Sequence, residues 1–372
     1  MMIDRRLVQH FDWVLLGFTL LLVGIGLLAL YSAVNAGPDV AHVTGPVYLK
    51  QAYWFCIGAA VMVVMFLFNY KWLNRWAFAI YAACVALLVA VVFVGKEVSG
   101  SQRWLAAGPW TFQPSELVKI SIVIVLARYF SDHASEEGFT LKDLWKPLIW
   151  TLIPFVLIAK QPDLGTGLVV VLIAGSVTLF VKIERRSLML LTVGGLAGSL
   201  FAWFFLLKDY QKERVLVLLN PGRDPLGAGY HVQQSMIAVG SGTLLGKGFL
   251  KGTQSALSFL PEQHTDFIFS VLAEEWGFLG SAVLVSLFLL VVIWGLSVAM
   301  RSKEPFGTIL AVGIASMIFW QTVINVGMAV GLLPVVGVTL PLISYGGSSL
   351  VAVMLGIGML MNISMRRFMF KS

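Results

Sequence analysis

Residues 259–280 read FLPEQHTDFIFSVLAEEWGFLG and join a polar loop directly to an apolar segment. Glu262, His264 and Asp266 precede that segment, and Glu274 and Glu275 lie inside it. The apolar run extends over residues 267–299, which is longer than the roughly 20 residues that cross a bilayer as a helix. The stretch therefore predicts a membrane-spanning helix that carries ionisable groups at and just beyond its beginning.

The rest of the chain has the composition of a membrane protein. It is 58% hydrophobic and only 12% charged, whereas soluble domains are about 25% charged. Apolar segments lie near residues 13–34, 52–69, 77–95, 115–130, 147–160, 164–181, 187–207, 267–299, 308–333 and 340–365. At about 20 residues per crossing, they predict an all-α polytopic membrane protein with about ten transmembrane helices. We expect residues 1–372 to form one integral membrane domain, with the first apolar segment retained as a span because it exceeds the about 7–15 residues of a signal-peptide core.

Basic residues of the short loops alternate between sides in a way that predicts the orientation. Those expected on one side are Arg5, Arg6, Lys71, Arg75, Lys142, Lys146, Lys182, Arg185, Arg186, Arg301, Lys303, Arg366, Arg367 and Lys371. Lys and Arg accumulate on cytoplasmic loops, so both termini are predicted in the cytoplasm. This pattern accounts for the net charge of +7 without a nucleic-acid partner. The long loop of residues 208–266 then faces outward, and its spaced apolar residues predict short interfacial helices.

In this topology the unusual ionisable residues gather at the outer membrane boundary. They are Arg103, Glu116, Lys119, Lys160, Asp163, Arg214 and Asp266. Other roles stay open for several of them. Asp163 could only favour a helix amino terminus, Glu116 and Lys119 could only form an ion pair, and Glu274 could line the cavity or pack. Asp266 is the strongest functional candidate, because an ionisable group beside an apolar helix is costly unless it lines a polar cavity.

Several familiar motifs are absent. The stretch GSGTLLGKG, residues 240–248, lacks the spacing of a phosphate-binding P-loop and its Ser or Thr after the Lys. The stretch SYGGSSL, residues 344–350, is not a G-x-S-x-G nucleophile elbow. Cys56 and Cys84 lie in apolar runs without metal or disulfide spacing.

Long motifs in a fixed order resemble one known family. They are QRWLAAGPWTFQPSELVK (102–119), QPDLGTG (161–167), DPLGAGYHVQQSMIAVGSGTLLGKGFLKGTQS (224–255), FLPEQHTDFIFSVLAEEWG (259–277) and NVGMAVGLLPVVGVTLPLISYGGSS (325–349). Over nearly its full length the chain resembles the SEDS family, named for shape, elongation, division and sporulation, and its elongation members more than its division members. The resemblance implies a ten-span peptidoglycan glycosyltransferase of the bacterial cytoplasmic (inner) membrane that polymerises lipid II on the outer side. It also implies a class B penicillin-binding protein as transpeptidase partner within the elongation machinery, and an Asp essential for polymerisation at Asp266.

The residues suit this chemistry. The acceptor 4-hydroxyl attacks the anomeric carbon of an undecaprenyl-diphosphate-linked donor with inversion, so Asp266 could act as a general base. Arg103, Lys119, Lys160 and Arg214 are candidates for holding the diphosphate, and Glu116 and Asp163 complete the predicted substrate-binding set. The sequence leaves open a divalent cation, Mg²⁺ or Mn²⁺, held by Glu116 or Asp266. The alternatives are a lipid II flippase or transporter, which should carry its charges near the midplane, and a non-catalytic scaffold for the penicillin-binding protein.

Overall fold

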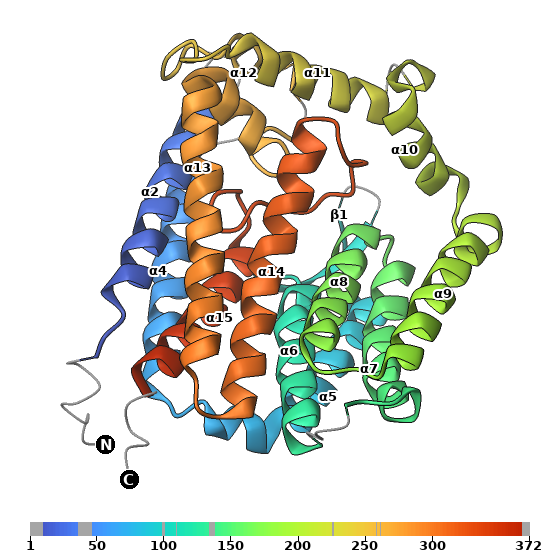
Figure 1. Cartoon of the computed structure of the whole chain (residues 1–372). Helices are drawn as coiled ribbons and strands as arrows, with labels where there is room; N and C mark the ends of the chain where they lie inside the picture. The colour runs from blue at the N-terminus through green and yellow to red at the C-terminus, as the bar shows by residue number, and fades with distance from the viewer. Residues whose placement is uncertain are drawn as a thin grey trace.

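Ten long helices run side by side in the computed structural model, which describes residues 10–35, 47–98, 101–108, 110–133, 138–224, 227–257, 259–260 and 262–366 (Figure 1). Their bounds are α2 (Trp13–Asn35), α4 (Val47–Leu67), α5 (Lys71–Val94), α6 (Pro114–Asp132), α7 (Leu141–Lys160), α8 (Leu164–Phe180), α9 (Arg185–Phe201), α13 (Ile268–Arg301), α14 (Pro305–Ala329) and α15 (Gly347–Arg366). The predicted all-α polytopic fold is confirmed.

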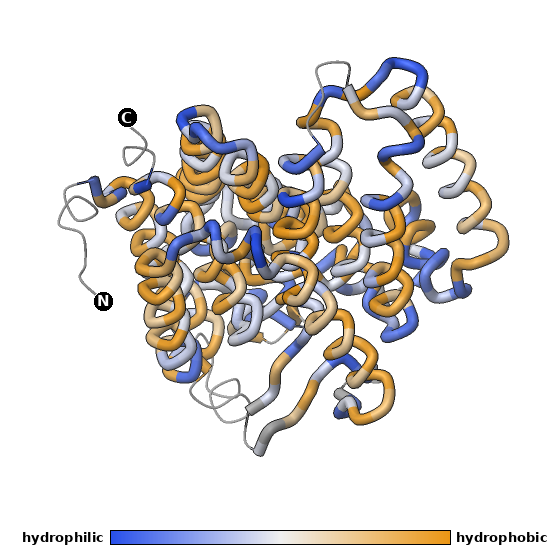
Figure 2. The backbone as a smooth tube through the Cα atoms, turned by 90° about the horizontal axis from the view of Figure 1, so that it is seen from below, coloured by the Kyte–Doolittle hydropathy of each residue, from blue (hydrophilic) through white to orange (hydrophobic). Residues whose placement is uncertain are grey.

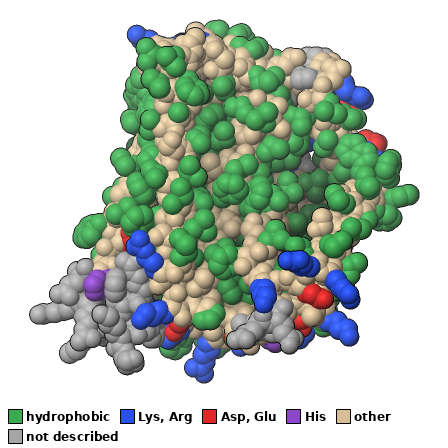
Figure 3. All heavy atoms as spheres, in the orientation of Figure 1, with side chains coloured by type: hydrophobic (Ala, Val, Ile, Leu, Met, Phe, Trp, Pro, Cys, Tyr) green, Lys and Arg blue, Asp and Glu red, His purple; other side chains and the backbone are tan. Residues whose placement is uncertain are grey.

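Seven of these helices are long and apolar enough to cross a membrane. They are α2, α4, α5, α13, α14, α15 and α9 together with the π-helical turn Ala202–Leu206. Helix α8 is apolar but has 17 residues, while α6 and α7 carry charged residues within their spans. The helix turns on the outside of the bundle consist mainly of hydrophobic residues (Figure 2). Figure 3 shows hydrophobic side chains across the middle of the molecule and Lys and Arg toward its ends, as a bilayer requires.

Burial differs sharply between helices. Helix α6 is buried along most of its length and forms the centre of the bundle. It packs closely against α14: a Cβ added to Gly313 of α14 would lie only 2.3 Å from the side chain of Val123 of α6. In contrast, Ser187 is the one buried residue of α9. Figure 1 shows α9 at the side of the bundle, and Figure 3 shows the surface hollowed beside it.

Short helices occupy the segment between α9 and α13. They are α10 (Asp209–Leu219), the 3₁₀ turn η2 (Pro221–Arg223), α11 (Ala228–Ser241) and α12 (Thr253–Ala256). In Figure 1 they lie across one end of the bundle. That this end faces outward, and that these helices are interfacial, stay predictions.

A small β-sheet precedes α6 and was not predicted. Strands β1 (Lys96–Val98), β2 (Ser101–Ala107) and β3 (Trp110–Phe112) pair in the order β1-β2-β3, and both pairs are antiparallel. Leu105 lies opposite Phe112 in the second pair. Two strands have only 3 residues, too few for an alternating pattern to stand out. The sheet matters because it carries Arg103 to the site described below.

A break in α13 lies beside its buried carboxylate Glu274. Gly277 has a φ of 67°, a conformation that glycine adopts without the steric cost of a Cβ. The loop before α12 pairs with the helix at this break: the Lys247 amide donates to the Glu274 carbonyl at 3.0 Å, and the Phe278 amide donates to the Thr243 carbonyl at 2.9 Å. The carboxylate of Glu274 is fully buried and accepts from Lys247 Nζ at 2.6 Å.

The opposite end of the bundle joins the beginning of α2 to the end of α15. Asp12 accepts a hydrogen bond from Ser364 Oγ at 2.7 Å, and its two carboxylate oxygens share the one N–H of Trp294 Nε1, each at 3.0 Å. These contacts agree with the prediction that both termini lie on one side. The terminal basic residues Arg5, Arg6, Arg367 and Lys371 lie outside the described residues.

Candidate active site

Asp266 lies in a tight turn immediately before α13, and the turn is fixed by hydrogen bonds to its main chain. Asn325 of α14 donates to the Asp266 carbonyl at 2.9 Å and to the Val338 carbonyl at 2.8 Å. The Ser344 hydroxyl donates to the Thr265 carbonyl at 2.6 Å, and the Tyr345 amide to the His264 carbonyl at 2.9 Å. Helix α14 and the loop after it therefore hold the Asp266 backbone, which leaves its side chain available.

The Asp266 carboxylate is half-buried and accepts no hydrogen bond from the described residues. It lies beside Gly337, where an added Cβ would be 3.4 Å from Oδ2. Burial, together with the nearby Glu262 carboxylate, raises the pKa of Asp266 to about 6, although Arg103 and Arg214 oppose the rise. A carboxylate with such a pKa is still mostly ionised at pH 7 and is a stronger base than an ordinary Asp.

A second acidic side chain, Asp163, caps the amino terminus of α8. Its Oδ1 accepts from the Thr166 amide at 3.2 Å, and its Oδ2 accepts from Gln113 Nε2 at 3.1 Å. Arg103 Nη1 approaches Oδ1 at 3.8 Å, and Arg103 Nε also donates to the Gln161 carbonyl at 3.2 Å. Burial raises the pKa of Asp163 and Arg103 opposes the rise. The helix-capping role that the sequence left open for Asp163 is observed.

Four helices begin at this end of the bundle, and their first residues are linked. Gln113 precedes α6, its side chain reaches Asp163 at the start of α8, and its amide donates to Ser348 Oγ in the first turn of α15 at 3.1 Å. Asp266 stands at the start of α13. Each helix amino terminus carries the equivalent of about half a positive charge, so their convergence favours an anion such as a phosphate group.

The structure brings Arg214 to this site but not Lys160. Arg214 of α10 donates to the Val335 carbonyl at 3.2 Å, two residues before Gly337, and its charge acts on Asp266. Lys160 is exposed and lines a separate polar pocket with Glu97 and Gln102. Arg103 and Arg214 are thus the predicted cations that lie around Asp266.

Glu116 and Lys119 form an ion pair on α6, with Nζ and Oε2 2.8 Å apart. Both side chains are buried, which favours the structural role that the sequence left open. Other buried polar atoms on α6 and α14 lack hydrogen-bond partners within the described residues: Ser115 Oγ, both amide atoms of Gln321 and Asn325 Oδ1. Unpaired buried groups are rare in native proteins, so these atoms indicate a polar interior below the site.

The described residues contain no group of three or more His, Cys, Asp or Glu side chains arranged to hold a metal ion. One carboxylate such as Asp266 would therefore need ligands from outside the chain, for which diphosphate oxygens are chemically suitable. The divalent cation stays a prediction.

Some residues of the site were not singled out from the sequence. Asn325 and Gln113 hold the two acidic turns in place. His231 of α11 stacks on Phe267, with ring centroids 6.3 Å apart and planes 10° apart, and burial lowers its pKa. The one available signal was the position of all three within the long quoted motifs, which does not distinguish structural from functional residues.

Together the fold and the site define a polytopic α-helical membrane protein with a basic carboxylate and two arginines at one end of its bundle. The chain belongs to the cell cycle protein family of FtsW, RodA and SpoVE, whose family model matches residues 12–368.

Relatives and solved structures cover nearly the whole chain. The peptidoglycan glycosyltransferase MrdB of Escherichia coli strain K12 is 42% identical over 361 residues, which cover 97% of this chain and 95% of that protein. The peptidoglycan glycosyltransferase RodA of Treponema pallidum is 35% identical, covering 97% of this chain and 99% of that protein.

Two solved structures show the same fold. A chain from a peptidoglycan synthase complex that coordinates polymerization and crosslinking superposes with a TM-score of 0.80 at 31% identity, covering 96% of this chain and 98% of that chain. The rod shape determining protein RodA of Thermus thermophilus superposes with a TM-score of 0.71 at 29% identity, with the same coverage.

Proposed function

We propose that this chain is a peptidoglycan glycosyltransferase that joins lipid II units into glycan strands during cell elongation and maintenance of cell shape. The relatives with the names above support this activity. The observation that carries it is the setting of Asp266, whose carboxylate accepts no hydrogen bond from the described residues and has a pKa of about 6 beside Arg103 and Arg214. A carboxylate that only stabilised the fold would be expected to have its hydrogen bonds satisfied.

The reaction is a single displacement. The 4-hydroxyl oxygen of the acceptor sugar forms a bond to the anomeric carbon of the donor, and the bond from that carbon to the lipid diphosphate breaks. Asp266 takes the hydroxyl proton as the new bond forms, so an α-linked donor gives a β-linked product. General-base catalysis of this kind contributes about 10²–10⁴-fold to the rate. The diphosphate departs with its electron pair and needs no general acid, unlike the leaving group of an inverting glycosidase.

The leaving diphosphate requires positive charge close to Asp266. Arg103 and Arg214 supply full charges, and the amino termini of α6, α8, α13 and α15 supply partial ones. Charge placed where negative charge develops lowers the barrier without reorganisation during the reaction. The same positive charges keep Asp266 ionised near neutral pH by opposing the effect of burial on its pKa.

The substrate lipid remains in the bilayer while its sugars and diphosphate reach the site. Helix α9 leaves a lateral opening in the bundle, because it has one buried residue and the surface beside it is hollowed (Figure 3). The site lies at an end of the bundle rather than at its middle. This placement favours a polymerase over a transporter, whose sites typically lie near the membrane midplane.

The proposal places the chain in the bacterial cytoplasmic membrane, with both termini inside and Asp266 outside. A class B penicillin-binding protein is the proposed transpeptidase partner, supported by the similar chain found in a peptidoglycan synthase complex. The substrates are lipid II and the growing undecaprenyl-diphosphate-linked glycan. Asp266 or Glu116 would hold a divalent cation, Mg²⁺ or Mn²⁺, which would supply further positive charge for the departing diphosphate.

The test is purified protein, alone and with its penicillin-binding partner, supplied with lipid II and assayed for polymer. Polymer formed by the purified protein supports the enzyme. Transfer of labelled lipid II across a vesicle membrane without polymer would support the flippase instead. Polymer that depends only on a glycosyltransferase in the partner would support the scaffold.

A further inference from the structure

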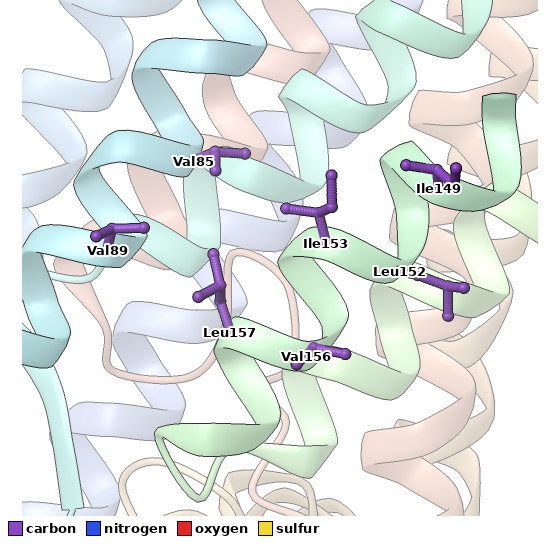
Figure 4. A pocket seen from close by; sticks show the side chains of 7 residues that line it. All are labelled: Val85, Val89, Ile149, Leu152, Ile153, Val156 and Leu157. Atoms are coloured by element: carbon purple, nitrogen blue, oxygen red, sulfur yellow. The ribbon is translucent and has the colours of Figure 1, made fainter.

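An apolar groove lies between α5 and α7 on the outside of the bundle. It has a volume of about 540 Å³ and is lined by Val85 and Val89 of α5 and by five aliphatic side chains of α7. In Figure 4 the α5 side chains face Ile153 and Leu157 of α7. Val156, farther out on α7, is 47% exposed. The groove is therefore open to the acyl-chain region of a bilayer.

Two hydrogen bonds fix the spacing of α5 and α7 at either end of this groove. The Tyr81 hydroxyl of α5 donates to the Trp150 carbonyl of α7 at 2.9 Å. Eleven residues after Trp150 on the chain, Gln161 Nε2 donates to the Leu88 carbonyl at 3.0 Å, and Gln161 is buried. Most of the apolar side chains lie between these two hydrogen bonds, so the groove is a fixed feature rather than loose packing.

A polar pocket of about 290 Å³ follows the groove along α5 and α7, on the side of Gln161. This pocket is lined by Val92 of α5, by Glu97 of β1, and by Lys160 at the end of α7. Val85, Val89 and Val92 are spaced by four and three residues, and so are Ile149, Ile153, Val156 and Lys160. Residues at this spacing share one face of a helix. The two hollows thus follow one another along one stripe of these helix faces, which is apolar over most of its length and polar at one end.

The stripe has the dimensions of one leaflet. Ile149 and Lys160 are 11 positions apart, which at 1.5 Å per residue gives about 16 Å. Half of a hydrocarbon core of about 30 Å is about 15 Å. Lys160 therefore lies at headgroup depth when the apolar part lies in the leaflet. Lys160 is exposed and forms no ion pair among the described residues.

We propose that this stripe is a binding site for a polyprenyl diphosphate lipid, with the polyprenyl chain in the α5–α7 groove and the diphosphate at Lys160. A single apolar groove ending at a single cation matches a lipid with one chain and an anionic head better than a phospholipid with two chains. Lys is a common ligand for phosphate. Identifying the lipid as substrate or leaving group of this enzyme rests on the proposed function.

One turn of the chain separates the polar pocket from the candidate active site. Lys160, Gln161 and Pro162 directly precede Asp163, and the Gln161 and Pro162 carbonyls accept hydrogen bonds from Arg103. Arg103 in turn pairs with Asp163. A diphosphate at Lys160 would therefore occupy the other side of the turn that Arg103 holds. The site suits a lipid arriving at, or leaving from, the charged cluster around Asp266.

The probe is a photoreactive polyprenyl diphosphate, added to purified protein in lipid nanodiscs and mapped by mass spectrometry of the labelled peptides. The protein carries Asp266→Asn, so that labelling is measured without turnover. We expect labelling within α5 and α7. Lys160→Gln should reduce it about tenfold, the effect of losing about 1.4 kcal/mol of a charged contact. Val156→Trp fills the groove and should reduce labelling similarly, while Glu97→Gln removes a repulsive charge and should increase it.

The matched control is Val193→Trp on α9, which is also apolar and exposed to lipid at 63% and should leave labelling unchanged. Excess phosphatidylglycerol should not compete with the probe. Equal labelling of Lys160→Gln, Val156→Trp and the parent protein would overturn the site, as would full competition by phosphatidylglycerol. Because no turnover is required, a wild-type protein that fails to polymerise lipid II while the labelling pattern holds would count against the proposed function alone.

Discussion

The side-chain amide of Asn325 donates to the main-chain carbonyl of Asp266 at 2.9 Å, so a buried residue of α14 fixes the catalytic candidate without touching its carboxylate. The same amide nitrogen donates to the Val338 carbonyl. Asn325 is fully buried within α14. This one side chain joins α14, the turn before α13, and the loop that carries Gly337.

Asn325→Ala should lower the turnover number while KM changes little. The substitution releases the Asp266 carbonyl, and a displacement of reacting groups near 1 Å can cost about 10²-fold in rate. The measurement is steady-state polymerisation per folded protein, with the acid limb of the pH profile retained. Thr322→Ala is the control, because that hydroxyl bonds only to the Ile318 carbonyl of its own helix, at 2.8 Å. A lower melting temperature with unchanged turnover per folded molecule would assign Asn325 a purely structural role.

The rate of polymerisation should fall as the pH falls through about 6, because Asp266 must be ionised to accept a proton and its pKa is raised to about 6. The activity should be complete above that value and should fall about tenfold per pH unit below it. Two substitutions should move this limb in opposite directions. Arg214→Gln removes a charge that lowers the pKa of Asp266, so the limb should move to higher pH. Glu262→Gln removes a charge that raises this pKa, so the limb should move to lower pH.

The measurement is the rate of polymer formation between pH 5 and pH 8 at constant ionic strength. A limb that stays in place in both variants, or moves in the same direction in both, would show that the limb does not report Asp266.

The membrane-spanning fold was predictable because length and apolarity alone determine which segments cross a bilayer. The predicted span 267–299 corresponds to α13, Ile268–Arg301, and the other nine predicted spans also correspond to long helices. The β-sheet was missed because its pairing is local and its strands are short. That sheet is what carries Arg103 to the α7–α8 turn.

Glu274 should contribute to stability rather than to chemistry. Its buried carboxylate accepts from Lys247 Nζ, from the Thr253 amide at 2.8 Å and from the Gln254 amide at 3.1 Å. Glu274→Gln should lower the melting temperature clearly, because removing one partner of a buried pair costs about 3–5 kcal/mol. Asp132→Asn is the control, since Asp132 pairs with Arg128 at the surface, 48% exposed. Loss of turnover in folded Glu274→Gln, with an unchanged melting temperature, would contradict this assignment.

The candidate site was predictable in part. Asp266, Arg103, Asp163 and Arg214 converge as the topology required. Lys160 is separated from them, although it is three positions from Asp163 in the sequence, because it lies in a pocket on the other side of the turn. The role of Glu274 could not be predicted, because its partners belong to a loop that returns to α13 only in the folded chain.

The topology can be checked by reporter fusions. Fusions after residues 72, 140, 184 and 303 should report the cytoplasm, and a fusion after residue 225 should report the outside, because Lys and Arg concentrate on the cytoplasmic loops. The shared end of α2 and α15 requires that fusions near both termini report the same side. A cytoplasmic signal at 225 would place Asp266 on the wrong side for assembly of an external glycan.

The most direct measurement is lipid II polymerisation by purified Asp266→Asn, compared with wild type and Asp266→Glu. The Asn side chain keeps the size and removes the base, so we predict a correctly folded protein that binds its penicillin-binding partner and makes no glycan. Asp266→Glu should be slow, because one extra methylene displaces the carboxylate and a misplacement near 1 Å can cost about 10²-fold. Melting temperature and partner binding are measured on the same samples to establish folding. Polymer made by folded Asp266→Asn at the wild-type rate would contradict the general-base mechanism.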